Sequence, residues 1–268
     1  MVDLLAINPI AFSLGGLHVR WYGILIATGI ILGFIVVQRE MVKRGMHPDF
    51  LTDLLVWAVP IAIISARIYY VVFSWGYYKD NLGEVIQIWN GGIAIHGALI
   101  GAFITTYVFT KRRGISFWKV VDIAVPGLLI GQIIGRWGNF MNQEAHGGAV
   151  SEKFLNTTII PDWIMNQMTI EGVTYHPTFL YESMWNLVGL VIIILLRKVA
   201  LKRGEMFLFY LTWYSFGRFF IEGMRTDSLY GGVLRAAQVV SVVTIVIAVL
   251  LFVTRRYVQK IKTTYQDK

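Results

Sequence analysis

The chain has 268 residues, of which 56% are hydrophobic and only 15% are charged, and its formal charge is +8 at pH 7. Soluble domains are about one quarter charged, so this composition excludes a water-soluble globular fold and indicates an integral membrane protein. The absence of cysteine removes disulfide bonds, thiolate metal sites and a cysteine nucleophile belonging to the chain itself. The basic residues lie in short connections between apolar runs, which is a pattern of membrane topology and argues against nucleic-acid binding.

Seven apolar segments approach the length of about 20 residues that a membrane-spanning helix needs. They are residues 21–38, 51–75, 92–109, 120–135, 178–196, 206–221 and 234–254. We therefore predict an all-α polytopic membrane protein of about seven transmembrane helices, in which residues 1–268 form a single transmembrane domain.

Lysine and arginine gather in alternate connections between these segments and in the C-terminal tail. The three connections are those that follow the first, third and fifth segments, and they contain Arg39, Lys43, Arg44, Lys111, Arg112, Arg113, Lys119, Arg197, Lys198, Lys202 and Arg203. The positive-inside rule then places the C-terminus in the cytoplasm and the N-terminus outside. The connection of residues 136–177 faces outward and is too long for a simple turn, so we expect a small extracytoplasmic cap there.

Polar residues mark the outer ends of the first and third segments. Tyr22 lies in Arg20-Trp21-Tyr22-Gly23, where interfacial aromatic residues usually serve as anchors. His96 lies in Gly91-Gly92-Ile93-Ala94-Ile95-His96-Gly97. A lone histidine in a membrane helix either performs proton transfer or simply bonds a backbone carbonyl, and the sequence leaves both roles open.

The fourth segment combines a glycine stripe with an arginine. Gly127, Gly131 and Gly135 recur at intervals of four residues and form a flat surface that lets a neighbouring helix approach closely. Packing alone accounts for these glycines, but the stripe also directs Arg136 into the bundle, where an arginine costs about 2.5–3.5 kcal/mol on insertion scales. The run that follows contains Asn139, Asn142 and Glu144, and forms either a capping turn or part of a binding site.

The end of the sixth segment carries Arg218, Glu222 and Arg225 at spacings of four and three, which place them on one helical face. A salt-bridge ladder between helices explains Glu222, whereas the surplus of arginine indicates an anionic guest, and arginine is suited to phosphate. Glu182 lies inside the fifth apolar segment, so it should have a basic partner.

Two other functional classes fit these residues less well. A secondary transporter predicts charges near the midplane and an inverted repeat, whereas here the charges collect at one face. An intramembrane protease has no support from a Gly-x-Ser-x-Gly or His-Glu-x-x-His motif. A membrane transporter or binding protein for an anionic lipid or solute remains the alternative to an enzyme.

Five sequence blocks together resemble one enzyme family. They are residues 20–23, residues 92–97, residues 135–144 (Gly-Arg-Trp-Gly-Asn-Phe-Met-Asn-Gln-Glu), residues 176–182 (His-Pro-Thr-Phe-Leu-Tyr-Glu) and residues 217–225, which run from Gly217 through Glu222 to Arg225. In this order they resemble the signature of the bacterial prolipoprotein diacylglyceryl transferases, over nearly the whole chain. The resemblance implies a multi-pass protein of the bacterial cytoplasmic (inner) membrane with its active site at the outer leaflet.

The resemblance also implies a reaction. The family transfers the diacylglyceryl group of phosphatidylglycerol to the lipobox cysteine thiol of a preprolipoprotein signal peptide, which forms a thioether and releases glycerol phosphate in the first step of lipoprotein maturation. Expected partners are phosphatidylglycerol, the preprolipoprotein and membrane lipids, with no nucleic acid, metal or cofactor.

Roles for single residues follow from this reaction. We expect Arg136 and Arg218 to neutralise the phosphate and His96 to act as the base. The residues expected to bind substrate are Arg136, Asn139, Glu144, Tyr22, Glu222 and Arg225.

Overall fold

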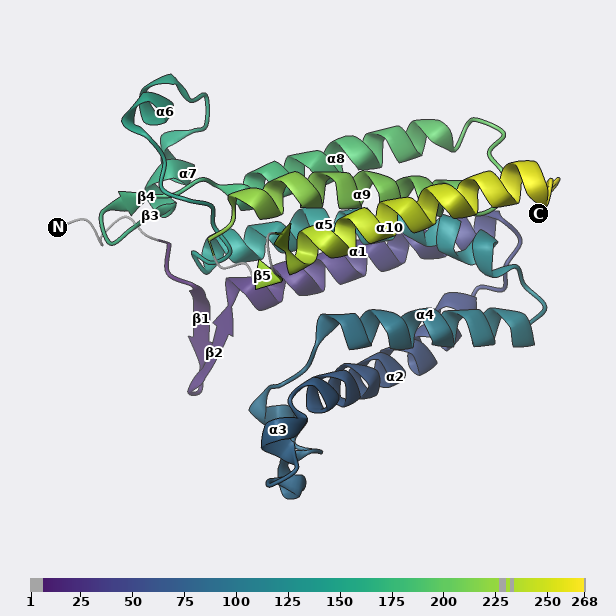
Figure 1. Cartoon of the computed structure of the whole chain (residues 1–268), viewed down its shortest axis with the longest axis horizontal. Helices are drawn as coiled ribbons and strands as arrows, with labels where there is room; N and C mark the ends of the chain where they lie inside the picture. The colour runs from purple at the N-terminus through teal and green to yellow at the C-terminus, as the bar shows by residue number, and fades with distance from the viewer. Residues whose placement is uncertain (1–6, 227–229, 232–233, 268) are drawn as a thin grey trace. The chain divides into compact units, whose positions relative to one another are not determined.

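The computed structural model of the chain describes residues 7–226, 230–231 and 234–267. Each of the seven predicted segments overlaps one long helix (Figure 1). These helices are α1 (Trp21–Lys43), α2 (Phe50–Phe73), α4 (Ile95–Arg112), α5 (Phe117–Met141), α8 (Thr178–Leu196), α9 (Glu205–Met224) and α10 (Ala236–Val253).

Five helices in the described part of the chain are long and apolar enough to cross a membrane. They are α1, α2, α5, α8, and α10 together with the π-helical turn Thr254–Val258 that extends it. Helices α4 and α9 fall outside this set, since α4 ends in basic residues and α9 carries Glu205, Arg218 and Glu222. A helical, multi-pass membrane protein is therefore supported, whereas the count of seven spans stays a prediction.

The remaining elements are short. Three separate antiparallel hairpins pair β1 (Ile10–Leu14) with β2 (Leu17–Arg20), β3 (Thr169–Ile170) with β4 (Val173–Thr174), and β5 (Tyr230–Gly231) with β6 (Leu234–Arg235). Short helices are α3 (Trp75–Tyr78), α6 (Glu152–Thr157), α7 (Asp162–Gln167) and the 3-10 turns Leu82–Glu84 and Ile88–Asn90.

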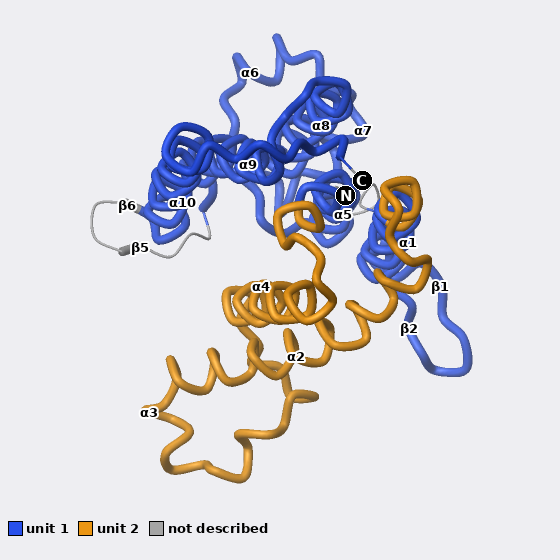
Figure 2. The backbone as a smooth tube through the Cα atoms, turned by 90° about the vertical axis from the view of Figure 1, so that its right-hand side faces the viewer, with its two compact units in different colours: residues 1–37, 122–267 blue, residues 38–121, 268 orange. Residues whose placement is uncertain are grey.

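The chain packs as two compact units, coloured separately in Figure 2. Unit 1 contains Met1–Val37 and Asp122–Asp267, and unit 2 contains Gln38–Val121. The boundaries fall within α1 and within α5, so both helices contribute to both units. The prediction of a single transmembrane domain stays a prediction, and each unit is described by itself.

In unit 1, α1 and α5 approach each other through small residues. A side chain at Gly33 would lie 2.9 Å from the Gly127 carbonyl oxygen, and one at Gly29 would lie 3.3 Å from the Cα of Gly131. Glycine at these positions lets the two backbones pack directly, which is how membrane helices gain van der Waals contact. The predicted close approach along the glycine stripe is thereby confirmed.

Helices α8 and α9 are joined by two tryptophans. The Trp185 and Trp213 rings stack with centroids 4.2 Å apart and planes 10° apart. Trp185 lies against Gly217 of α9, and Trp213 lies against Gly189 of α8. Each glycine comes four residues after the tryptophan on its own helix, so the same Trp-x-x-x-Gly spacing occurs on both helices and fixes their relative register.

The connection between α5 and α8 begins later than predicted. Residues 136–141, which we expected in the cap, form the last turns of α5. The helix stops where Gln143 adopts a left-handed φ of 53°, and Ala145 follows at 59°. The connection then folds onto the helix ends through an apolar cluster made of Phe140, Ile164, Met168 and Phe179.

In unit 2, α2 and α4 pack closely, and a buried arginine holds the segment between them. A side chain at Gly101 would collide with Ser65 of α2, which explains the small residue there. The Arg67 guanidinium is buried and donates to the carbonyl oxygens of Glu84, Val85, Gly91 and Gly92 at 2.6–2.8 Å. Backbone carbonyls thus provide the partners of this charge.

Candidate functional site

Glu182 of α8 joins two arginines from two other helices of unit 1. Its carboxylate forms an ion pair with Arg136 of α5, and its other oxygen lies 2.5 Å from Arg218 of α9. Arg218 also pairs with Glu222, one turn further along α9, at 2.5 Å. Both glutamates are buried, whereas the two arginine side chains are about one fifth exposed. We call these four residues the arginine–glutamate cluster.

The cluster exists because three helices bring their charged residues to the same end of unit 1. Arg136 lies near the C-terminus of α5, Glu182 lies in the second turn of α8, and Arg218 precedes the end of α9 (Figure 1). Glu182 thus has the basic partners that its place in an apolar segment required. The predicted ladder between Arg218 and Glu222 is also present.

Asn139 and Glu144 extend the cluster from Arg136 toward the surface. The Asn139 side chain accepts a long hydrogen bond of 3.4 Å from Arg136 and donates one of 2.9 Å to the Glu144 carboxylate. The Glu144 amide also donates to the Asn139 carbonyl at 3.0 Å. Glu144 is therefore linked to Arg136 through Asn139.

Tyr22 of α1 packs against Gly138 of α5. Its ring packs where a side chain at Gly138 would otherwise sit, 2.7 Å from that position. Tyr22 is about one third exposed, so its hydroxyl-bearing ring remains accessible beside the turn of α5 that contains Arg136 and Asn139.

Arg225 lines a narrow pocket beside the arginine–glutamate cluster. The other polar residues that line this pocket are Arg136, Asn139, Thr178 and Glu182. The pocket has no room for a water molecule in this conformation. Its walls are tied together, because Gly147 forms a β-bridge with Arg225 and Thr178 donates its hydroxyl to the Ala145 carbonyl at 2.6 Å. The connection that follows α5 therefore closes over the cluster.

His176 stands at the edge of this closed region. Its amide and carbonyl exchange hydrogen bonds with Gly148 and Gly147, and its ring lies 3.2 Å from the Tyr181 hydroxyl. Partial burial lowers the pKa of His176 from the ordinary histidine value. Burial thus favours the neutral imidazole at His176.

His96 lies in unit 2, in the first turn of α4. Its ring is exposed and faces Tyr69 of α2 with centroids 6.0 Å apart. Within the residues that the structure describes, His96 makes no hydrogen bond to a backbone carbonyl. Arg136 and Arg218 belong to unit 1, so the role of His96 toward them stays a prediction.

The residue that sequence reasoning left out of the site is Glu182. It was expected to need a basic partner, but the structure makes it the common partner of both arginines. The signal was a carboxylate in an apolar segment, although the sequence did not reveal which arginines it meets.

The arrangement can hold a phosphate. Each guanidinium has five N–H donors, and the contacts with Glu182, Glu222 and Asn139 occupy only part of them. Two arginines fixed by one buried carboxylate are pre-oriented for charge-assisted hydrogen bonds to an anion. Because the pocket is closed, a phosphate must displace part of these contacts when it enters.

Comparisons with known proteins give a consistent result. A family model described as prolipoprotein diacylglyceryl transferase matches residues 9–254. Among curated proteins, the chain is 63% identical over 267 residues to a phosphatidylglycerol–prolipoprotein diacylglyceryl transferase of Lysinibacillus sphaericus, covering 98% of both chains. Proteins of the same name are 61% identical in Bacillus velezensis (93% of both chains) and 55% identical in Geobacillus kaustophilus (98% of this chain and 97% of that one).

Proposed function

The chain belongs to the prolipoprotein diacylglyceryl transferase family, and we infer from this membership that it modifies the cysteine of a bacterial preprolipoprotein. It is a transferase that moves the diacylglyceryl group of phosphatidylglycerol to a cysteine thiol, the reaction named in its relatives. The alternative of a transporter or binding protein for an anionic lipid or solute gains no support from these names.

The observation that carries the mechanism is the convergence of Arg136 and Arg218 on Glu182. The thiol sulfur attacks the carbon of the diacylglyceryl group that carries the phosphate, a carbon–sulfur bond forms, and the bond from that carbon to the phosphate oxygen breaks. Glycerol phosphate leaves with the electron pair of that bond, so negative charge grows on the phosphate. Fixed guanidinium groups aimed at this charge stabilise the transition state more than the ground state.

The thiol must lose its proton before or during attack. A cysteine thiol has a pKa near about 8.5 and is mostly protonated at neutral pH. His96 takes this proton, and it is suited to do so because its ring is exposed and, among the described residues, bonds no carbonyl. Asn139 and Glu144 hold Arg136 in orientation. Tyr22, Glu222 and Arg225 complete the substrate-binding set.

The membrane orientation is part of the same proposal. The basic residues gather in alternate connections and in the C-terminal tail, and the positive-inside rule puts these in the cytoplasm. With seven spans, the N-terminus then lies outside. The connection that follows α5 then forms an extracytoplasmic cap, and the arginine–glutamate cluster faces the outer leaflet. The substrate cysteine of a lipobox peptide and the phosphatidylglycerol headgroup meet there.

A reconstituted assay tests the activity. The full-length protein is purified in detergent and mixed with phosphatidylglycerol labelled in its headgroup glycerol and with a peptide containing a lipobox cysteine. We expect the peptide mass to increase by one diacylglyceryl group while labelled glycerol phosphate is released. A peptide with serine in place of the cysteine is the matched control. An unmodified cysteine peptide in the presence of folded protein would contradict the assignment.

A further inference from the structure

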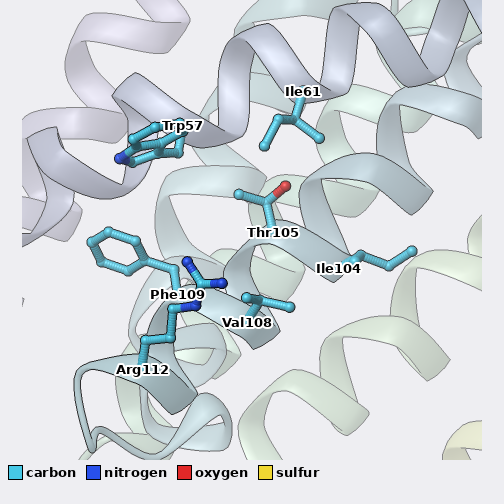
Figure 3. A pocket seen from close by; sticks show the side chains of 7 residues that line it. All are labelled: Trp57, Ile61, Ile104, Thr105, Val108, Phe109 and Arg112. Carbon is cyan, nitrogen blue, oxygen red and sulfur yellow. The ribbon is translucent and has the colours of Figure 1, made fainter.

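An apolar groove lies between α2 and α4 of unit 2 (Figure 3). Its volume is about 270 Å³. The residues that line it are Trp57, Ile61, Ile104, Thr105, Val108, Phe109 and Arg112. All of them belong to unit 2. Arg112 lies sixteen residues after His96 on α4, which is about 24 Å along the helix at ~1.5 Å per residue, so the groove is distinct from the base proposed above.

Arg112 is the charged residue of this groove, and its side chain reaches in beside Phe109 and Val108 (Figure 3). Within the described chain no carboxylate pairs with it. The neighbouring Arg113, by contrast, pairs with Asp53 at 2.8 Å and lies over the Phe109 ring. Arg112 is exposed in the last turn of α4, so its guanidinium is available to an anionic group from outside the chain.

The groove and its arginine together match one kind of molecule. Arginine binds phosphate through two parallel hydrogen bonds, which lysine cannot reproduce. Ile61, Ile104 and Val108 form an apolar wall beside it, suited to an acyl chain. Trp57 adds an aromatic ring of the kind that gathers at membrane interfaces. A phosphate and a hydrocarbon chain side by side are the features of a phospholipid.

We propose that this groove binds one anionic phospholipid of the cytoplasmic leaflet, with its phosphate on Arg112 and one acyl chain along Ile61, Ile104 and Val108. The leaflet follows from the proposed orientation, which places the end of α4 in the cytoplasm. The site is distinct from the proposed base, because Arg112 lies about 24 Å along α4 from His96. It makes unit 2 a lipid-binding element in its own right.

Photo-crosslinking tests the proposal and locates the bound lipid. The full-length protein, reconstituted in vesicles, is irradiated with phosphatidylglycerol that carries a photoactivatable group in one acyl chain, and the labelled peptides are identified by mass spectrometry. We expect labelling within residues 57–61 and 104–112. Photoactivatable phosphatidylcholine should label them about tenfold less, because its choline cation repels Arg112 and cancels the net negative charge of the headgroup, although the phosphate is kept.

Variants of two adjacent residues separate a specific site from general surface charge. Arg112→Gln should reduce the labelling about tenfold, whereas Lys111→Gln, which removes the same charge outside the groove, should leave it unchanged. Val108→Trp fills the groove and should also abolish the labelling while Arg112 is kept. Equal losses in Arg112→Gln and Lys111→Gln, equal labelling by both lipids, or no labelling of these peptides would each overturn the proposal. None of these readouts depends on transferase activity.

Discussion

Trp185 of α8 and Trp213 of α9 each donate the indole N–H to the other residue's backbone carbonyl, at 2.9 and 3.0 Å. Trp185 follows Glu182 by three residues. Its ring packs on Gly217, which is the residue immediately before Arg218. The register that this pair enforces between the two helices is therefore the register that brings Glu182 and Arg218 together.

Loss of one indole hydrogen bond should weaken this register. Trp213→Phe keeps an aromatic ring but removes the donor, so we expect a loss of about 1 kcal/mol in stability and a lower rate of transfer. The double variant Trp185→Phe with Trp213→Phe should lose less stability than the sum of the losses in the two single variants, because both hydrogen bonds belong to one contact. Thermal unfolding in detergent and the peptide assay measure the two effects, and the exposed Trp89→Phe is the control. Strict additivity would show that the two tryptophans act independently.

Glu182→Gln should lower both stability and transferase activity strongly, although it replaces a single oxygen by an amide nitrogen. The change leaves Arg136 and Arg218 without their shared carboxylate in a largely buried place, and removing one partner of a buried ion pair costs about 3–5 kcal/mol. Because both arginines are partly exposed, we expect a loss of stability toward the lower end of this range. We also expect little transferase activity to remain. The matched control is Glu152→Gln on the exposed surface of α6. A stable and active Glu182→Gln protein would mean that the arginines are held by other groups.

Arg136→Lys tests whether the geometry of the guanidinium matters. Lysine keeps the charge but cannot form two parallel hydrogen bonds to phosphate, so we expect most transfer activity to be lost while insertion and folding remain normal. Activity is measured with the labelled lipid, and Arg39→Lys on the exposed side of α1 serves as the control. Near-normal transfer at normal membrane levels would reduce Arg136 to a structural role.

His96→Asn tests proton transfer through its pH dependence. General-base assistance contributes about 10²–10⁴-fold in rate, so the variant should lose activity most at low pH. The loss should shrink as pH rises from about 6 to about 9, because the substrate thiol then ionises without help. His47→Asn, at the other end of unit 2, is the control. An equal loss at every pH would indicate that His96 positions substrate or packs α4, and another group would then accept the proton.

Reporter fusions test the orientation. A reporter placed after Lys111 and another placed after Lys153 are separated by α5, which is long and apolar enough to span the membrane. The two fusions should therefore report opposite sides, with the first in the cytoplasm. If both report the same side, α5 does not cross and the proposed topology fails.

The sequence by itself determined the class of fold and most of the chemical groups. Long apolar segments can bury themselves only in a membrane and must satisfy their backbone as helices, so each predicted segment overlaps a helix. Charges inside such segments are costly, so Arg136, Arg218 and Glu182 stood out without a structure.

Only the tertiary structure decided which of these groups meet. Glu182 lies 46 residues after Arg136 and 36 before Arg218, and no local spacing rule acts over such separations. Their meeting depends on the register of packed helices, which the glycine contacts of α1 with α5 and the tryptophan pair of α8 with α9 fix. Likewise, the buried Arg67 donates to the backbone carbonyls of Glu84 and Val85, which lie 17 and 18 residues further along the chain. Residue type sets which contacts are possible, and the close packing of helices selects among them.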